Sequence, residues 1–236
     1  MRIDFGGRTV IVTGGSGALG GAVVESFLEA GARVLVTYVV EAEVAPFRER
    51  FAGRGARVEL RRCDLRRADE VETLLGRVAP DSLRAVVNLA GGYTWTRVAD
   101  ADNAVLEHLL DLNLRTTFTV CRAAAPILTA AGGGAIVNVS ARAALQGEAG
   151  NGVYGATKAA VLALTQALSA ELKDAGVNVN AVLPSIIDTP ANRAAMPNSD
   201  PARWVAQADL ANVIVFLASD AAAAVHGAGV PVYGLA

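Results

Sequence analysis

Residues 12–20 read VTGGSGALG and stand between an apolar run, RTVIVTG, and a segment with helical periodicity over residues 18–30. A glycine-rich turn from a strand into a helix is the setting in which backbone N–H groups and a helix N-terminus hold a pyrophosphate. In such a turn Gly14 allows a tight bend, Gly17 a close approach of the backbone to the ligand, and Gly20 close packing of the helix on the sheet. The stretch therefore predicts a dinucleotide-binding turn, with a glycine-rich loop that merely tolerates positive φ as the alternative.

The alternation of strand and helix continues to the end of the chain. Short β-branched runs follow as RVLVTYV, ARVELRRC, LRAVVNLAG, GAIVNVS, VNVNAVLP and AGVPVYG, with helical patterns over residues 41–52, 68–78, 103–130, 152–174 and 206–218 between them. Seven strands joined by helical crossovers predict an α/β fold with a doubly wound, seven-stranded, mostly parallel sheet, which is a Rossmann fold. We expect a single domain over residues 1–236, with its ligand beyond the carboxyl ends of the strands.

Composition and charge narrow the class of protein. Hydrophobic residues make up 53% of the chain and aromatic residues 5%, which suits buried parallel strands covered by alanine-rich helices. A net charge of −2 with dispersed Lys and Arg predicts no nucleic-acid partner. No apolar run nears the roughly 18 residues of a membrane span and the start lacks a signal-peptide pattern, so we expect no membrane partner and a cytoplasmic protein. Cys63 and Cys121 lack metal-ligand spacing, and no metal site is expected.

A second stretch, VYGATKAAV over residues 153–161, has Tyr154 four residues before Lys158. Positions i and i+4 share one face of a helix, so the phenol and the ammonium are expected side by side. A phenol with a pKa of ~10 exchanges a proton near neutral pH only where a neighbouring positive charge favours phenolate. The pair is therefore a candidate acid/base, with an exposed helix pair of no consequence as the alternative.

In their order and spacing these motifs resemble the short-chain dehydrogenase/reductase family over essentially the whole chain. The shared landmarks are the turn of residues 13–20, Asp64 after the third strand, NLAG at residues 88–91, Asn113, Tyr154 and Lys158, and LPSIIDTP after the sixth strand. The resemblance implies hydride transfer between NAD(P) and a small-molecule substrate, with Tyr154 as general acid/base. It also implies that Lys158 holds the ribose hydroxyls and that Asn113 holds a water that passes protons towards Lys158.

The resemblance further implies a cofactor site, with Asp64 at the adenine, Ala90 and Gly91 near the riboses, and Thr189 at the carboxamide. The full set of cofactor-binding residues is Gly14, Ser16, Gly17, Ala18, Leu19, Tyr38, Asp64, Leu65, Asn88, Ala90, Gly91, Tyr154, Lys158, Pro184, Ile187 and Thr189. An acid at the end of the second strand holds the ribose 2′-hydroxyl of NAD, and an arginine there favours the 2′-phosphate of NADP. Tyr38 and Val39 take those places, and Glu41 and Glu43 come later. NAD(P) is expected, with a slight preference for NADP because no carboxylate occupies the discriminating place.

Two positions depart from the family pattern. Ala18 stands where the simplest family loop has glycine, and Gly17 makes the turn read TGxxGxxG, a spacing typical of sugar-nucleotide epimerases. A chain of 236 residues leaves no room for the substrate domain of those enzymes. The catalytic serine of the family lies about thirteen residues before the tyrosine, a position that Ala141 holds here. Ser140 is the alternative, so the candidate catalytic residues are Tyr154, Lys158, Asn113 and Ser140.

The alanine at position 141, LAGGYTW over residues 89–95 and DTPANRAAMP over residues 188–197 resemble the dihydropteridine reductase-like branch, which reduces a quinonoid pterin. The predicted reaction is therefore hydride transfer to a carbonyl or to a pterin-like C=N group. Tyr93, Trp95 and Trp204 are candidates to stack on a flat substrate, with packing of their loops against the core as the alternative, which we expect for Trp204. A 3-oxoacyl reductase-like carbonyl reductase and a nucleotide-sensing regulator are the alternatives. Family members commonly form dimers or tetramers, so a homodimer or homotetramer is expected.

Overall fold

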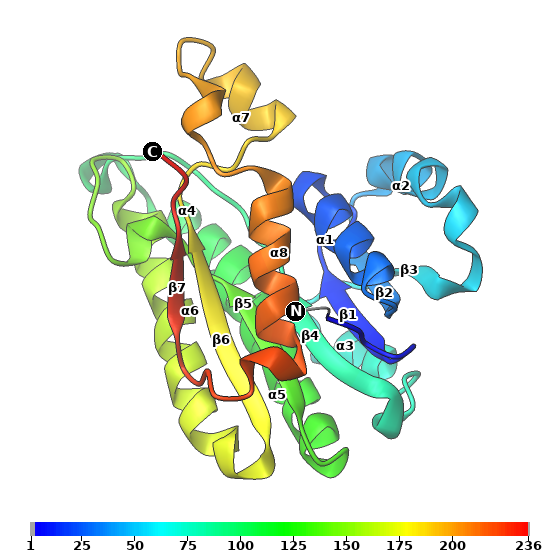
Figure 1. The fold of residues 1–236 in the computed structure, drawn as a ribbon. Coiled ribbons are helices and arrows are strands. Elements are labelled where there is room, and N and C mark those ends of the chain that lie inside the picture. Colours follow the sequence, from blue (N-terminus) through cyan, green and yellow to red (C-terminus); the bar gives the residue numbers. More distant parts are fainter. Residues whose placement is uncertain (1–2, 236) are drawn as a thin grey trace.

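Seven parallel strands form the centre of the structure, a computed structural model that describes residues 3–235 (Figure 1). Their spatial order is β3-β2-β1-β4-β5-β6-β7, and each neighbouring pair is parallel. The strands are β1 (Thr9–Thr13), β2 (Arg33–Tyr38), β3 (Val58–Arg62), β4 (Leu83–Asn88), β5 (Gly134–Val139), β6 (Val177–Pro184) and β7 (Gly229–Val232). The prediction of a doubly wound Rossmann-type sheet is confirmed, and the sheet is parallel throughout the described residues.

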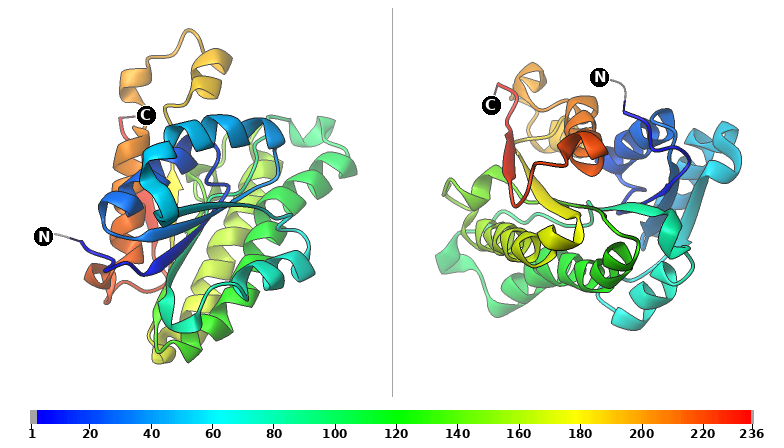
Figure 2. Two further views of the ribbon diagram at one scale, coloured as in Figure 1. Left: turned by 90° about the vertical axis from the view of Figure 1, so that its right-hand side faces the viewer. Right: turned by 60° about the horizontal axis from the view of Figure 1, so that its bottom comes forward.

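Helices cover both faces of the sheet, as Figure 2 shows. The helices are α1 (Ala18–Glu29), α2 (Val44–Arg50), α3 (Ala68–Leu75), α4 (Asn103–Leu109), α5 (Thr116–Ala130), α6 (Gly152–Leu172), α7 (Pro190–Ala195) and α8 (Gln207–Ala218). One hydrophobic cluster joins α1, α2 and α8 to the sheet, and a second joins α3 and α5 to the other face. These two layers bury both faces of the strands, as a parallel sheet requires.

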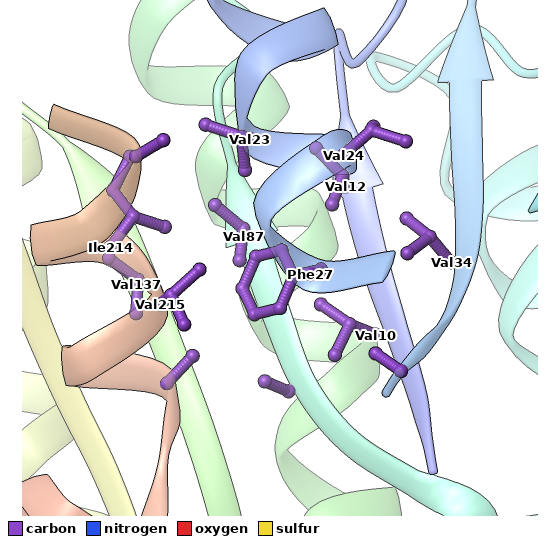
Figure 3. Packing of buried hydrophobic residues seen from close by; sticks show 14 of the residues in the cluster. Val10, Val12, Val23, Val24, Phe27, Val34, Val87, Val137, Ile214 and Val215 are labelled. Carbon is purple, nitrogen blue, oxygen red and sulfur yellow. The ribbon is translucent and has the colours of Figure 1, made fainter. Parts of the chain in front are cut away.

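Alternation along β1 shows how the sequence supplies both clusters. Val10 and Val12 belong to the cluster under α1 and α8, whereas Ile11 between them belongs to the opposite one. Phe27 of α1 lies near Val10 and Val87, and Ile214 of α8 lies near Val137 in the same cluster (Figure 3). Because helices cover both faces of the sheet, a central strand such as β1 (TVIVT) reads as a hydrophobic run, whereas the edge strand β3 (VELRR) carries charged residues.

Two segments differ from the helices expected from periodicity. The predicted helix over residues 103–130 is α4 and α5 joined by a π-helical turn, Leu110–Arg115. Helix α7 was not predicted; it begins after Thr189, whose hydroxyl accepts a hydrogen bond from the Asn192 N–H, and it has Pro190 at its first position. A single wide turn and a six-residue helix are too short to alter a 3.6-residue hydrophobic pattern.

The neighbours of β1 set the place of the ligand site. Because β2 and β4 lie on opposite sides of β1, the chain leaves β1 in one direction and later returns on the other side, which opens a crevice at the carboxyl ends of the strands. The segment that carries α7 projects above this end of the sheet (Figure 1). Within residues 3–235, no helix has both the length and the hydropathy needed to cross a bilayer.

Candidate active site

The turn between β1 and α1 is shaped by its backbone. Gly14 has φ +62°, and a Cβ on Gly20 would lie 2.5 Å from the backbone of Gly15. Gly20 thus allows the helix to pack on the loop that precedes it, and not directly on the sheet as predicted. Gly17 begins α1 without a side-chain cap, so the N–H groups of the first turn are left for an anion. A Cβ on Gly17 would meet nothing closer than 3.5 Å, so the protein itself does not need glycine there.

A cavity of about 550 Å³ opens beside this turn, beyond the ends of β1, β2 and β4. Eleven residues predicted to bind the cofactor line it: Gly14, Ser16, Gly17, Ala18, Leu19, Tyr38, Asp64, Leu65, Ala90, Gly91 and Thr189. They come from five separate segments of the chain. The tertiary structure therefore brings the predicted dinucleotide site together in one place.

Five predicted cofactor residues are not among those that line this cavity: Asn88, Pro184, Ile187, and the pair Tyr154 and Lys158 on α6. Asn88 is buried, and its side-chain N–H groups donate to Asn138 Oδ1 at 2.9 Å and to Cys121 Sγ at 3.4 Å. Asn88 thus connects β4 to β5 and does not face the cavity. The sequence could not show this, because a strand buried on both faces can direct a polar side chain to either face. Pro184 is buried at the end of β6, and Ile187 pairs with Val205 in a β-bridge.

Two charged residues of the cavity lining, Glu43 and Arg66, were not among the predicted site residues. The carboxylate of Glu43 accepts a hydrogen bond from the Ser16 hydroxyl. Tyr38 and Val39 stand at the end of β2 as predicted, and Glu43 adds to the lining a carboxylate that the end of the strand itself does not supply. Glu43 comes five residues after the strand in sequence, but a 3₁₀ turn, Glu41–Glu43, places it beside Ser16 of the phosphate loop. Arg66 also lines the cavity, where its guanidinium donates to Asp64 at 2.9 and 2.7 Å.

The candidate acid/base pair lies on α6, next to the cavity wall. The Lys158 Nζ is 5.8 Å from the ring centroid of Tyr154 and donates to the Val139 carbonyl at 3.0 Å, so the expected placement on one helix face is confirmed. A Cβ on Gly91 would lie 3.3 Å from Lys158 Nζ, which connects the pair to the cofactor cavity. A side chain at position 91 would therefore crowd Lys158 at this wall of the cavity.

Burial controls the acidities of both groups. It lowers the pKa of Lys158 to about 8. Burial, followed by the nearby Tyr93, raises the pKa of Tyr154 to about 12. The expected lowering of the phenol pKa by Lys158 is therefore not found in this structure, because desolvation acts in the opposite direction. Tyr154 is a protonated phenol at neutral pH, which suits a proton donor.

Asn113 is held rigidly in the π-helical turn. Its Oδ1 accepts from the Gly92 N–H at 2.9 Å, and its Nδ2 donates to the Gly92 carbonyl and to Thr157 Oγ1, both at 3.1 Å. A Cβ on Gly91 would lie 2.7 Å from Asn113 Oδ1. Asn113 thus connects the loop after β4, at Gly92, to α6 at Thr157, the residue before Lys158. A π turn in a helix is frequently a feature of functional sites.

The two candidates for the serine position differ in their surroundings. The Ser140 hydroxyl is buried and donates to the backbone carbonyl of Lys158 at 2.8 Å. Its hydroxyl is thereby engaged in attaching the end of β5 to α6. Ala141 follows in extended conformation, with φ −160° and ψ 161°, and begins the loop that leads to Tyr154.

An aromatic side chain, Tyr93, contacts Tyr154 in the first turn of α6. The ring of Tyr93 meets that of Tyr154 edge to face, with centroids 4.9 Å apart, and its hydroxyl donates to Asn151 Oδ1 at 2.9 Å. Tyr93 and Trp95 are 58% and 61% exposed. Trp204 is buried, which confirms that it plugs its loop.

Residues 8–200 match the family described as short chain dehydrogenase. The chain belongs to the short-chain dehydrogenase family. A probable galactose dehydrogenase of Rhizobium meliloti (strain 1021) is 32% identical over 94% of this short-chain dehydrogenase and 91% of its own length. A short-chain type dehydrogenase/reductase from Mycobacterium ulcerans has a similar structure, with a TM-score of 0.92 and 30% identity over 99% of this chain and 90% of that one. A gluconate 5-dehydrogenase from Burkholderia cenocepacia J2315, in complex with NADP and tartrate, has a TM-score of 0.88 and 25% identity over 99% and 95% of the two chains.

As a member of this family, the short-chain dehydrogenase is an NAD(P)-dependent oxidoreductase acting on carbonyl or alcohol groups. The relatives named above are sugar dehydrogenases or are named only by the family. They support the family and not its dihydropteridine reductase-like branch, so that finer assignment stays a prediction.

Proposed function

We propose that this short-chain dehydrogenase reduces a flat, conjugated C=N or carbonyl substrate of the quinonoid pterin type, with NAD(P)H as hydride donor and Tyr154 as proton donor. The observation that carries the proposal is the pairing of Ala141 with Ser140: the alanine stands at the serine position of the family, and the neighbouring serine hydroxyl is bound to the Lys158 carbonyl. A substrate would therefore receive no serine hydroxyl at its reacting oxygen or nitrogen.

The cofactor cavity fits a nicotinamide dinucleotide. The uncapped N-terminus of α1 suits the pyrophosphate, and Gly91 leaves space between the cavity and Lys158 that a Cβ would fill. Asp64 and Leu65 would hold the adenosine end, and Thr189 would lie towards the nicotinamide. Bound there, NAD(P)H supplies the hydride for the reduction. A phosphorylated cofactor would place its additional charge near Glu43, which argues against the slight preference for NADP.

The chain's own residues account for the proton. Tyr154 keeps its proton at pH 7, because its pKa is about 12, and it can donate that proton to the reduced substrate. Lys158, with a pKa of about 8, is mostly charged at pH 7 and stabilises the phenolate that forms. Its hydrogen bond to the Val139 carbonyl holds the ammonium in place beside the ring. Asn113 keeps the loop after β4 and the first turns of α6 at a constant separation.

The aromatic residues support a flat substrate. Tyr93 and Trp95 are exposed although aromatic residues are only 5% of the chain, and Tyr93 contacts the ring of Tyr154. Exposed aromatic faces beside a proton donor can stack on a conjugated ring. In such a ring the C=N group is already polarised by conjugation, so one proton donor suffices.

The experiment measures the rate of NAD(P)H oxidation with three types of substrate: a quinonoid dihydropterin, a simple ketone and a keto-aldonic acid. We expect the highest kcat/KM with the dihydropterin. A kcat/KM for the ketones that equals or exceeds it would contradict the proposal. Tight cofactor binding without turnover of any substrate would instead favour a nucleotide-sensing role.

Sugar or alcohol dehydrogenation is the second candidate, because the galactose dehydrogenase relative covers nearly the whole chain and a gluconate 5-dehydrogenase shares the fold. This reaction would run with Tyr154 as base and without a serine hydroxyl. Reduction of NAD(P)⁺ with a panel of aldoses and polyols tests it directly. Measurable turnover of a sugar at millimolar concentration, and none of a pterin, would favour this candidate.

We also propose a homodimer or homotetramer. Leu106 of α4 and Phe118 of α5 are large apolar side chains, 40% and 47% exposed, on neighbouring parts of the molecule. Light scattering that gives a single 24.2 kDa species would contradict this proposal.

A further inference from the structure

The ribose end of the cofactor cavity contains a carboxylate that comes from outside the phosphate loop and outside β2. Glu43 ends the 3₁₀ turn Glu41–Glu43, and its backbone N–H donates to the Val40 carbonyl at 3.1 Å. This short turn follows two exposed residues, Val39 and Val40, and places Glu43 next to Ser16, just before the start of α1. The Glu43 side chain is half-buried and lines the cavity together with Tyr38 and Ser16.

Ser16 fixes the position of this carboxylate. Its hydroxyl donates to Glu43 Oε2, which ties the phosphate loop to the turn after β2. Among the hydrogen bonds within residues 3–235, none goes to the other oxygen, Oε1. One oxygen is thus used for positioning, and the other is available to a hydroxyl donor in the cavity.

Charges around the cavity favour a neutral group at this point. The acidic lining residues are Glu43 and Asp64, and Arg66 is the basic one among the lining residues of the described chain. Arg66 already donates two hydrogen bonds to Asp64, at 2.9 and 2.7 Å, and is exposed to solvent. A phosphate dianion near Glu43 would therefore meet a carboxylate with no free cation to compensate for it.

We infer that Glu43, positioned by Ser16, is a specificity-determining residue that accepts a hydrogen bond from the adenosine ribose 2′-hydroxyl and excludes a 2′-phosphate. The inference rests on the proposed NAD(P)-dependent function and deepens it: NADH, not NADPH, is the cofactor. Glu43 follows Tyr38 by five residues in sequence, yet both line the same cavity. Its carboxylate thus takes the role of the acidic residue that is absent from the end of β2 itself.

The test measures binding, not turnover. Dissociation constants of NADH, NADPH, 5′-AMP and adenosine 2′,5′-bisphosphate are determined by calorimetry for the wild type, Glu43→Gln and Glu41→Gln. The last two nucleotides differ only by the 2′-phosphate and need no nicotinamide. Gln keeps an oxygen that can accept from Ser16, so Glu43→Gln removes charge with little change of shape. Glu41→Gln removes the same charge from the exposed start of the same turn, outside the cavity lining.

The wild type should bind NADH at least tenfold more tightly than NADPH, and 5′-AMP more tightly than the bisphosphate. Glu43→Gln should reduce the NADH preference to within about threefold, mainly by strengthening NADPH binding, and Glu41→Gln should leave the preference unchanged within twofold. Ser16→Ala should lower the preference by less than Glu43→Gln does, because the carboxylate remains.

Two results would overturn the inference while leaving the proposed function in place: tighter binding of NADPH by the wild type, or an NADH preference that Glu43→Gln does not change. The wild-type ratio decides the matter even if a variant fails to fold. Absence of any nucleotide binding to the folded wild type would overturn the proposed function itself, and this inference with it.

Discussion

The two ends of the crevice are built in different ways. At the cofactor end the determining features belong to the backbone: Gly14 with φ +62°, the contact of Gly20 with the loop, and the uncapped first turn of α1. At the catalytic end they are buried polar side chains, each with a defined partner, such as Asn113 on Gly92 and Lys158 on Val139. Changes at the first end should act through steric fit and affinity. Changes at the second should act through proton transfer and, because charge is buried there, through stability.

The largest effect is expected at the catalytic end. Tyr154→Phe removes the proton donor and keeps the ring that packs on Tyr93, so kcat should fall by about 10²- to 10⁴-fold, or roughly 3 to 5 kcal/mol. The dissociation constant of NADH should change by less than about twofold. Steady-state kinetics and calorimetry check both values. If the variant kept more than about a third of the wild-type kcat, Tyr154 would not be the acid/base.

Next in size is a matched pair of substitutions at the cofactor end. Gly20→Ala places a Cβ 2.5 Å from the backbone of Gly15, which should lower the free energy of unfolding by about 2 to 3 kcal/mol. Gly17→Ala meets nothing closer than 3.5 Å and should change stability by less than about 0.5 kcal/mol, while weakening NADH binding by about tenfold. Urea denaturation and calorimetry separate the two. Equal loss of stability in both variants would show that Gly17 serves the fold and not the ligand.

Lys158→Met should have opposite effects on activity and stability. It removes a buried charge whose pKa is lowered to about 8, so the protein without cofactor should gain about 1 to 2 kcal/mol at pH 7 while turnover is lost. A lysine whose pKa is lowered by folding destabilises the native state below pH 8, and this cost disappears as the pH rises from 8 to 10.5. The gain should therefore shrink over that range. The exposed Lys173→Met is the control, and a loss of stability at pH 7 would count against the burial argument.

A smaller effect is expected at the serine position. Ala141→Ser should raise kcat/KM for simple ketones by about tenfold, near 1.4 kcal/mol, since it adds one donor, and should leave reduction of a quinonoid dihydropterin unchanged within about twofold. Ala149→Ser in the exposed part of the same loop is the control. Should Ser140→Ala abolish ketone activity while Ala141→Ser has no effect, Ser140 would be the catalytic serine after all.

The smallest effect concerns pH. The rate of substrate reduction should fall to about half as the pH rises from 7 to 8, because Lys158 loses its charge around its pKa of about 8 while Tyr154, with a pKa of about 12, stays protonated. A pH profile of kcat measured with saturating cofactor checks this. A profile that is flat from pH 6 to 10 would show that the ammonium charge does not contribute to the rate.

Much of the fold followed from local patterns. The alternation of β-branched runs with helical periodicity predicted all seven strands and the long helices, because the central strands are buried on both faces and read as short apolar runs. The π-helical turn at Leu110–Arg115 and helix α7 were outside the reach of periodicity, since neither is long enough to change a hydrophobic repeat.

For the candidate site too, the features that depend on sequence neighbours could be predicted, and those that depend on tertiary packing could not. Spacing within one helix was enough to pair Tyr154 with Lys158, and the order of residues was enough to recognise the phosphate turn, because both depend on neighbours in sequence. The acidities were not predictable: burial raises the pKa of Tyr154, whereas the adjacent lysine had indicated the opposite. Burial depends on every element packed around the helix.

By itself, then, the sequence determined the succession of strands and helices along the chain, the glycine-rich turn, and the pairing of Tyr154 with Lys158. All three arise from contacts within a few residues. Only the tertiary structure decided which face Asn88 and Ser140 turn to, and that Glu43 returns to the phosphate loop. The physical reason is that a doubly buried strand gives no polar pattern to identify its faces, and that a turn's direction is set by what it packs against. Function in this protein depends on both kinds of information, because its cofactor cavity is formed by segments distant in sequence.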